Sequence, residues 1–352
     1  MRGLASFAMT GRYRALLLAI ASSGSLLFAW VGAAIVALVT LRKGSGEGFW
    51  VLLWASLPAL VVMQVSGDSS TLSLLLGTGV LALVLRNSAS LTLAALASTA
   101  VAVVSGVGLL LFGQAMLAEL SDLFAQFFQA LERQTAESGG EPMRLQPPTQ
   151  GQLAGLMGTA NGLLSFLCLA LARYWQAALY NPGGFGAEFR RLRLPPGLVW
   201  ALALAALAVA SLGLAYRSWA AALLLPLTIA GFALLHARAA LRGQGSFWLG
   251  GIYVAWLVFD AAKLALVVLV FADTVMNFRG RWQQGAGGSS EDAQQQDALE
   301  QEDQQSRPVD EPGEQAETDR GSDDVGPGDP RDARESGQGA LPDDEPDERK
   351  QD

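Results

Sequence analysis

The chain has 352 residues, of which 51% are apolar and 16% are charged, whereas about a quarter of the residues in soluble domains are charged. This composition argues against an ordinary soluble domain and favours a membrane protein. The net charge of -8 hides two opposite parts, because residues 284–352 hold 22 acidic and 6 basic residues, and residues 1–283 hold 18 basic and 10 acidic ones. The sequence therefore predicts a basic membrane domain over 1–283 and an acidic extension over 284–352.

Apolar runs recur along the first 283 residues. A helix needs roughly 20 apolar residues to cross about 30 Å of hydrocarbon, and lipid offers no partner to unpaired backbone amides, so the crossings must be helical. The period-2 alternation of a membrane barrel is absent. We therefore predict an all-α, polytopic transmembrane bundle of eight or nine helices. The candidate crossings are Ala15–Leu41, Phe49–Val65, Thr71–Leu85, Leu91–Phe112, Gln152–Tyr180, Leu198–Tyr216, Trp219–His236 and Phe247–Val275.

The first run has two interpretations. It is too long for the h-region of a signal peptide and lacks an A-x-A-like cleavage site, so it is expected to be retained. Its 27 residues form either one tilted helix or the second leg of a hairpin that begins near Leu4 and turns at Ser22-Ser23-Gly24. Short cytoplasmic loops hold an excess of Lys and Arg. The single helix gives no such bias, whereas the hairpin places 12 basic residues inside and 5 outside. The hairpin is preferred, and its ninth crossing would place the acidic extension outside the cytoplasm.

Residues 114–150 leave the hydrocarbon and contain an amphipathic helix. Interfacial helices that bind anionic lipid usually carry Lys and Arg on the polar face, whereas this polar face is acidic. We expect the helix to pack on the bundle or to lie on its outer surface. Its apolar side holds Leu117, Leu120, Phe124, Phe127, Phe128 and Leu131, and its polar side holds Glu119, Asp122, Gln126, Gln129 and Glu132.

A glycine stripe begins the next apolar run. The spacings of four, three and four place these residues on one helical face, which favours close helix packing. Asn161 lies inside the stripe and could donate a hydrogen bond to a ligand or to a neighbouring helix. The stripe consists of Gly151, Gly155, Gly158 and Gly162.

A turn-rich, basic loop follows this run, over Asn181–Gly186 and the arginines before Pro195. Arginines next to a membrane span are first a topology signal for the cytoplasmic side. A contact with lipid headgroups or with a cytoplasmic partner is the second interpretation. The predicted cytoplasmic basic loop holds Arg173, Arg190, Arg191 and Arg193.

Two opposite charges, Asp260 and Lys263, lie midway along the last apolar run. Three residues apart, they share one helical face, and each costs about 3 kcal/mol at the bilayer centre. We expect them to pair and to face the interior. They either contact a substrate or coupling ion, together with Asn161, or lock neighbouring helices as a self-neutralised pair.

No constellation of catalytic residues stands out. The single histidine, His236, lies at the end of a predicted crossing and is expected to be a boundary residue. Walker, Gly-x-Ser-x-Gly and His or Cys cluster motifs are absent, and the single cysteine, Cys168, excludes an intrachain disulfide. We therefore predict a protein that is not an enzyme, with no cofactor, no metal site and no nucleic-acid partner.

The acidic extension has no aromatic residue after Trp282 and a large charge excess. Such a composition buries too little apolar surface to offset chain entropy, so disorder is predicted for 284–352. The extension is either a solvated tail or a segment that recruits a basic partner.

Three stretches together resemble the YybS-like predicted membrane proteins of bacteria. They are Leu41-Arg42-Lys43-Gly44, the stretch from Arg173-Tyr174-Trp175 through Asn181-Pro182-Gly183-Gly184-Phe185 to Glu188-Phe189-Arg190, and Phe271-Ala272-Asp273 leading to Asn277-Phe278-Arg279. The resemblance covers roughly residues 1–282 and implies a multipass inner-membrane protein without an established biochemical activity. More distantly, the front half is similar to the substrate-binding S components of energy-coupling-factor transporters.

Two functions remain open from the sequence. The first is a small-molecule carrier or substrate-capture subunit, with a pocket near the midplane lined by Asn161, Asp260 and Lys263. The alternative is a membrane scaffold that gathers partner proteins through its loops and acidic tail. Both place the protein in the lipid bilayer of the inner membrane.

Overall fold

The computed structural model describes residues 2–25, 27–138 and 146–282, and these ranges contain helices without a strand. The all-α prediction is confirmed for them, while the predicted disorder of 284–352 lies outside the described residues. In chain order the helices are α1 (Arg2–Met9), α2 (Arg12–Ser23), α3 (Ala29–Lys43), α4 (Ser45–Ser66), α5 (Ser70–Ser88), α6 (Leu91–Phe112), α7 (Gln114–Glu137), α8 (Gln150–Tyr180), α9 (Gly184–Arg191), α10 (Pro196–Ser211), a 3-10 turn at Leu214–Tyr216, α11 (Arg217–Leu223), α12 (Leu225–Leu241), α13 (Ser246–Val258) and α14 (Asp260–Met276).

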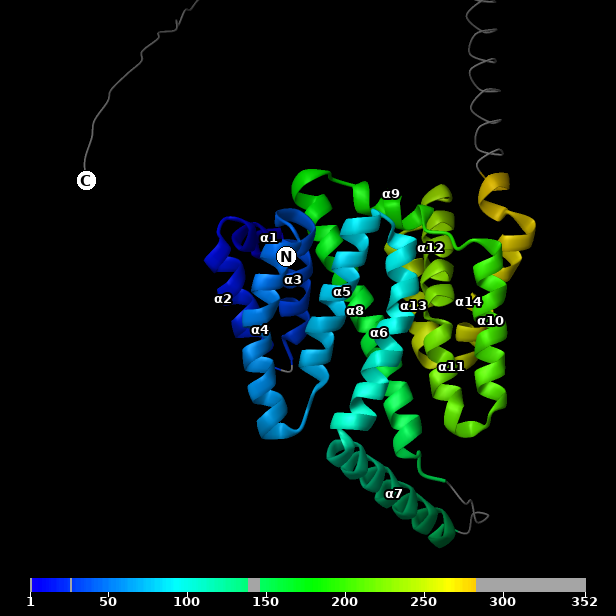
Figure 1. Cartoon of the computed structure of the whole chain (residues 1–352). Helices are drawn as coiled ribbons and strands as arrows, with labels where there is room; N and C mark the ends of the chain where they lie inside the picture. Colours follow the sequence, from blue (N-terminus) through cyan, green and yellow to red (C-terminus); the bar gives the residue numbers. More distant parts are fainter. Residues whose placement is uncertain (1, 26, 139–145, 283–352) are drawn as a thin grey trace, which may run out of the picture. The chain divides into compact units, whose positions relative to one another are not determined.

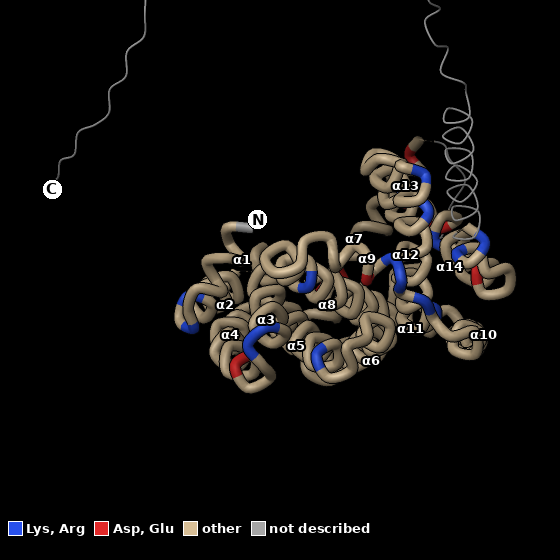
Figure 2. Tube along the Cα trace, turned by 90° about the horizontal axis from the view of Figure 1, so that it is seen from above, with Lys and Arg blue, Asp and Glu red and all other residues tan. Residues whose placement is uncertain are grey.

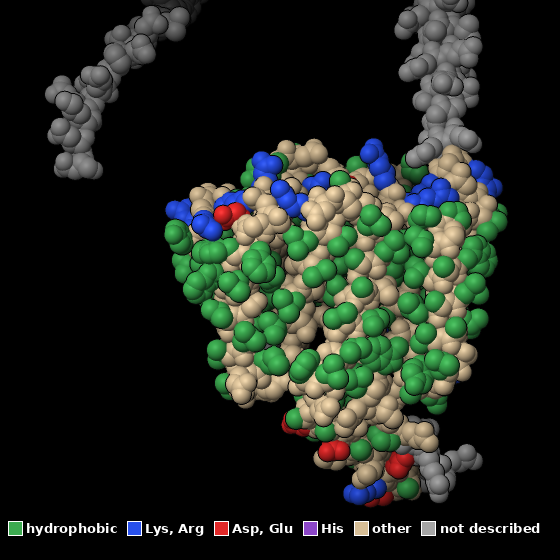
Figure 3. All heavy atoms as spheres, viewed as in Figure 1, with side chains coloured by type: hydrophobic (Ala, Val, Ile, Leu, Met, Phe, Trp, Pro, Cys, Tyr) green, Lys and Arg blue, Asp and Glu red, His purple; other side chains and the backbone are tan. Residues whose placement is uncertain are grey.

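One end of the bundle gathers the ends of many helices and most of its basic side chains. Arg86, near the end of α5, donates to the carbonyls of Thr40 and Leu41 at the end of α3, at 3.1 and 2.9 Å. Thr92, at the start of α6, donates to the carbonyl of Arg193 at 3.4 Å. We call this end the arginine face. Lys and Arg side chains gather at this end in Figure 3. The basic residues on the helix ends and loops that meet here are Arg12, Arg14, Arg42, Lys43, Arg86, Arg173, Arg190, Arg191, Arg193, Arg238, Arg242, Arg279 and Arg281.

The opposite end carries α7, and we call it the α7 face (Figure 1). Here Gln152, at the start of α8, donates to the carbonyl of Leu214 at 3.2 Å. Acidic side chains of α7 dominate this end, and a broad band of apolar side chains separates it from the arginine face (Figure 3). This order of a basic end, an apolar band and an acidic end is typical of a bundle that crosses a bilayer with its arginines on one side.

The helices of the described chain support part of the predicted set of membrane crossings. In the described part of the chain, α4, α5, α6 and α8 are each long and apolar enough to span a membrane, and counting each of three bent helix pairs as one span raises the number to seven. Length and composition therefore support four to seven of the eight or nine predicted crossings. The first and last apolar runs instead fold into short helices that turn back.

The first run forms the predicted hairpin, with its turn where the sequence placed it. Helix α2 ends at Ser23, and Gly24 caps it by donating to the carbonyls of Ile20 and Ser22. Helix α3 then returns to the arginine face, packed against α2, α4, α5 and α8. The hairpin's first leg is interrupted between Met9 and Arg12, which separates α1 from α2. Arg12 pairs with Glu47 at 2.9 Å and lies over the Trp50 ring.

The last apolar run, Phe247–Val275, is bent and does not form the single straight helix that the sequence predicts. Helices α13 and α14 meet at Phe259 with a bend of 115°, so Phe247–Val275 is not one straight crossing. Helix α12 leads into α13 at the arginine face, where Arg238 lies over the Trp282 ring, and α14 returns there, where Arg193 donates to Asn277. Trp282, the end of the described chain, lies at the arginine face.

Candidate functional site

The loop between α8 and α10 builds one wall of the candidate site. Helix α8 ends at Tyr180, and Gly183 takes a left-handed conformation, φ +85°, that starts α9. A residue with a Cβ is strained there, so the predicted turn needs this glycine. Arg173 of α8 then pairs with Glu188 of α9 at 2.8 Å, with both side chains mostly covered. This ion pair fixes α9 across the arginine face and leaves the arginines at its end free to turn elsewhere.

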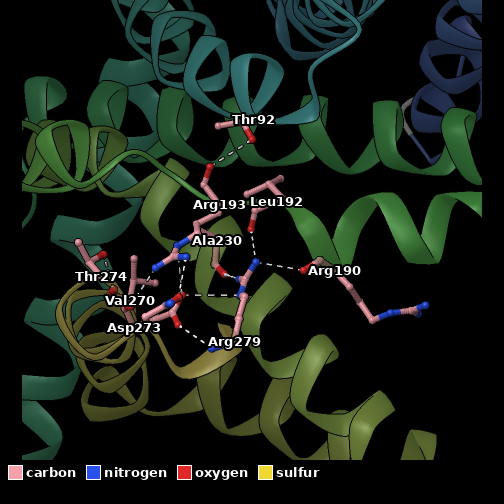
Figure 4. A network of polar contacts seen from close by, with 10 residues as sticks. Thr92, Arg190, Leu192, Arg193, Ala230, Val270, Asp273, Thr274 and Arg279 are labelled. Atoms are coloured by element: carbon pink, nitrogen blue, oxygen red, sulfur yellow. Dashed lines mark hydrogen bonds and ion pairs between the residues drawn. The ribbon is translucent and has the colours of Figure 1, made fainter. Parts of the chain in front are cut away.

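Asp273, in the last turn of α14, is the most buried acidic residue of the site, with its side chain 6% exposed. Its Oδ2 lies 3.6 Å from Arg279 Nε and 3.8 Å from Arg193 Nε, and its Oδ1 accepts from the backbone amide of Arg279 at 3.4 Å. Asn277 accepts from Arg193 Nη1 at 2.9 Å. One carboxylate thus holds two guanidinium groups from segments far apart in sequence (Figure 4).

Arg279 holds the loop between α9 and α10 through hydrogen bonds to backbone carbonyls. Its Nη1 donates to the carbonyls of Arg190 and Leu192 at 3.0 and 2.8 Å, and its Nη2 donates to Ala230 of α12 at 3.4 Å. Burial lowers the pKa of Arg279 and Arg193 acts in the same direction, whereas Asp273 raises it. An arginine stays protonated in proteins despite such a shift. Its charge is therefore permanent, and its N–H groups bind carbonyls of two segments, residues 190–192 and helix α12.

A cavity of about 660 Å³ opens beside this network. Arg190 and Arg191 line it without an ion-pairing carboxylate among the described residues, and the Arg190 side chain points away from Asp273 (Figure 4). Since Asp273 already serves two arginines, the cavity has an excess of positive charge. The full lining is Ala187, Arg190, Arg191, Arg193, Ala237, Ala240, Leu241, Asn277, Arg279, Gly280 and Trp282.

The cavity is suited to an anion. A guanidinium presents its N–H donors in a planar fork that matches phosphate and carboxylate oxygens. Basic pockets between membrane helices also bind phosphate-bearing headgroups. The cavity also has an apolar wall, formed by the ring of Trp282, the Leu241 side chain and the alanine methyl groups. A ligand with an anionic end and an apolar part therefore fits best.

Asn161 lies elsewhere, within the bundle. Its Nδ2 donates to Ser105 Oγ of α6 at 2.7 Å, the interhelical use that the sequence left open. It also borders a cavity of about 250 Å³ whose lining includes Ser70 and Thr71 of α5. The residue therefore has a structural partner and a small polar cavity, both remote from the arginine face.

Asp260 and Lys263 form the predicted pair, with Lys263 Nζ donating to Asp260 Oδ1 at 2.7 Å. Their side chains are 96% and 46% exposed, respectively, so the expectation that they face the interior is wrong. The bend at Phe259 places them at the tip of α13 and α14, where no neighbouring helix covers Asp260. Asn161, in contact with α6, does not share a pocket with them.

Three glycines of the predicted stripe lie against neighbouring helices. A Cβ on Gly158 would collide with the carbonyl oxygen of Ala102, and one on Gly162 would lie 2.7 Å from the carbonyl oxygen of Ser98, both on α6. Gly155 meets α11 in the same way, with Ser218 Oγ at 2.6 Å. Gly151 has no such neighbour, and its carbonyl accepts from Trp219 Nε1 at 3.0 Å. The stripe lets the backbone of α6 and the side chains of α11 lie directly against the backbone of α8.

His236 has structural partners. Its Nδ1 lies 2.9 Å from the carbonyl oxygen of Phe232, its Nε2 lies 3.4 Å from the Tyr253 hydroxyl, and the Phe189 ring meets it edge-on. Within the described ranges, His, Cys, Asp and Glu side chains form no group of three that could hold a metal.

Sequence reasoning assigned no role to Asp273 or Arg279, which entered only as part of a family resemblance. A signal was present, because an acidic residue ends the last apolar run and a basic residue follows six positions later. The partner Arg193 is 80 residues away from Asp273 in sequence, so no local pattern could connect them.

In comparisons with known proteins, no family profile, no curated protein and no solved structure matches this chain.

Proposed function

We propose that this chain is a multipass protein of the bacterial inner membrane that captures a small phosphate-bearing molecule at the arginine face, as a carrier or substrate-capture subunit. One observation carries the proposal, namely that Arg190 and Arg191 line a cavity of about 660 Å³ while the nearby Asp273 is held by two other arginines. The guanidinium N–H groups of Arg190 and Arg191 can therefore donate hydrogen bonds to a ligand in the cavity. The kinship with the YybS-like family is part of this proposal and is independent of the cavity.

Phosphate is favoured over other ligands by the kind of donor present. Several converging guanidinium groups bind a multiply charged tetrahedral anion through paired N–H donors, whereas a cation would be repelled. A free phosphate ester and a lipid headgroup share this chemistry, since the cavity lies where membrane helices meet the surface.

Ligand-induced stabilisation of the purified full-length chain tests the proposal. The probes are inorganic pyrophosphate in solution and nanodiscs with or without phosphatidic acid. We expect one of the two to raise the thermal midpoint of unfolding, because a ligand that binds only the native state stabilises it by mass action. Pyrophosphate alone would identify a soluble ligand, and phosphatidic acid alone a lipid.

Two double variants make the test specific. Arg190→Gln with Arg191→Gln should abolish the stabilisation, while Arg133→Gln with Arg217→Gln removes the same charge from the α7 face and should preserve it. If neither probe stabilises the wild-type chain, or if both double variants lose the response equally, the site is not an anion site.

The orientation follows from the same reasoning, with the arginine face in the cytoplasm because basic residues accumulate there. A fluorescent protein fused after Gly285 should then fluoresce. Alkaline phosphatase inserted between Glu137 and Gln150 should be active, since it would lie outside the cytoplasm. The opposite pair of results reverses the orientation.

The acidic extension supports the alternative function of a membrane scaffold. Its 22 acidic residues over 284–352 could recruit a basic protein by charge complementarity. Crosslinking in cells with and without 284–352 decides this, because an identical set of crosslinked partners removes the role of the extension.

A further inference from the structure

Helix α7 leaves most of its apolar side uncovered. Leu117 is buried against α8, in a cluster with Leu109, Leu153 and Ala154, but contact with the bundle ends within the next turn. Beyond it Leu123 is 54% and Phe127 61% exposed. Leu120, Leu123, Phe124 and Phe127 line an open hollow of about 300 Å³. The expectation that α7 packs on the bundle holds only for its first turns.

The buried end of α7 fixes the direction of this apolar side. Leu117, Phe124 and Leu131 are seven residues apart and lie on one side of a helix. Since Leu117 packs against α8, which spans the membrane, the rest of the stripe faces toward the bundle and the bilayer around it. The helical spacing places Glu119, Asp122 and Gln126 on the opposite side, and acidic side chains lie on the α7 face away from the apolar band (Figure 3).

The chain on either side of α7 holds it at the membrane boundary. Only Gly113 separates α7 from α6, whose last residues, Leu111 and Phe112, are 62% and 77% exposed within the apolar band. At the other side, Ser121 Oγ donates to the carbonyl of Pro148 at 3.1 Å, directly before α8. The exposed face of α7 is thus continuous with the lipid-facing surface of α6.

We infer that α7 is an interfacial helix whose apolar side, Leu123, Phe124, Phe127 and Leu131, inserts between the headgroups and acyl chains of the leaflet at the α7 face. Helices with this amphipathic pattern bury their apolar side about 5–10 Å into that boundary. The acidic polar side stays in water, so insertion depends on apolar burial and needs no anionic lipid. Insertion is therefore expected in a zwitterionic bilayer, and phosphatidylcholine serves as the probe lipid.

The chain has a single cysteine, Cys168, which is buried, so replacing it allows a label to be attached at one chosen position. On a Cys168→Ser background, Phe127→Cys and Gln126→Cys place an environment-sensitive NBD label on the apolar and polar sides of α7, one residue apart. The full-length protein is reconstituted in phosphatidylcholine nanodiscs that contain doxyl-labelled lipid. Leu123→Cys repeats the apolar-side measurement, and gel filtration confirms that each labelled protein is folded.

We expect the labels at residues 123 and 127 to be quenched at least twofold by the doxyl lipid and to be shielded from aqueous iodide. The label at residue 126 should be quenched by iodide and not by the lipid. Two results would overturn the inference. Equal iodide quenching at 126 and 127 would place the apolar side in water, and shielding of 127 from both quenchers would mean that a protein surface, such as a second copy, covers it.

Discussion

Two hairpins enter and leave the bundle at the arginine face, and they are buried to very different extents. Helix α3 of the first hairpin is fully covered from Gly32 to Thr40 by α2, α4, α5 and α8. Helix α13 of the second has no buried residue and lies at the edge of the bundle (Figure 2). Both are apolar, so hydropathy does not distinguish a central helix from a peripheral one.

Side-chain size explains the difference. The central part of α3 holds Ala33, Ala34 and Ala37, and small residues let helix backbones approach closely where no hydrophobic force drives association in lipid. Helix α13 instead contacts α12 through aromatic rings, while its small residues Gly250 and Gly251 lie against no neighbour. The Tyr253 ring stacks on Phe232 of α12 at 4.6 Å between centroids. Helix α13 is therefore attached by rings at one side and is otherwise left to lipid.

The second hairpin is held mainly at the end of α14. Leu266 packs onto Gly231 of α12, and Asp273 joins Arg193 and Arg279. A thinly packed hairpin with one strong polar anchor differs from a hairpin held along its whole length. Three predictions separate these two modes of attachment.

The largest effect is expected at the anchor. Asp273→Asn keeps the shape of the side chain but removes the charge that two arginines share, and breaking a buried ion pair costs about 3–5 kcal/mol. The midpoint of thermal unfolding in detergent should fall steeply. Asp260→Asn, on the same helix but exposed, is the matched control and should leave the midpoint of thermal unfolding nearly unchanged, because solvent screens an exposed charge. Equal losses from both variants would contradict the role of Asp273 as an anchor.

Much of the first hairpin and of the helices that follow it could be predicted from sequence. The predicted crossing Leu91–Phe112 coincides with α6, and the turn at Ser22-Ser23-Gly24 ends α2 where expected. These features depend on local signals, namely the length of an apolar run and its turn residues.

The second hairpin could not be predicted in the same way. The apolar run Phe247–Val275 continues through Phe259, where the backbone becomes extended without a proline or glycine at the break. The burial of Asp273 and the exposure of Asp260 depend on which helices cover α14. Which helices cover α14 is a property of the tertiary packing. The composition of the apolar run therefore could not predict that one of its two acidic residues is buried and the other exposed.

The second prediction compares the two hairpins with one substitution. Ala37→Leu adds a large side chain where α3 is covered on all sides, and overpacking a filled core costs about 1–3 kcal/mol. Ala255→Leu makes the same change in α13, where lipid can yield, and should leave the thermal midpoint nearly unchanged. Thermal unfolding followed by gel filtration measures both. A similar loss in α13 would show that another protein surface covers it.

The smallest effect is expected at the tip of the second hairpin, from Asp260→Leu combined with Lys263→Leu. An exposed ion pair contributes little to stability, and removing both charges also removes their desolvation cost if lipid surrounds the tip. The double variant should therefore unfold at the same temperature as the wild-type chain or slightly above it. Because the pair lies apart from the arginine cavity, stabilisation by the phosphate-bearing probe should be unchanged. A loss of several kcal/mol, or a lost response to the probe, would instead mean that the tip of α13 and α14 contacts a functional surface and that the anchor at Asp273 is only part of how this hairpin is held.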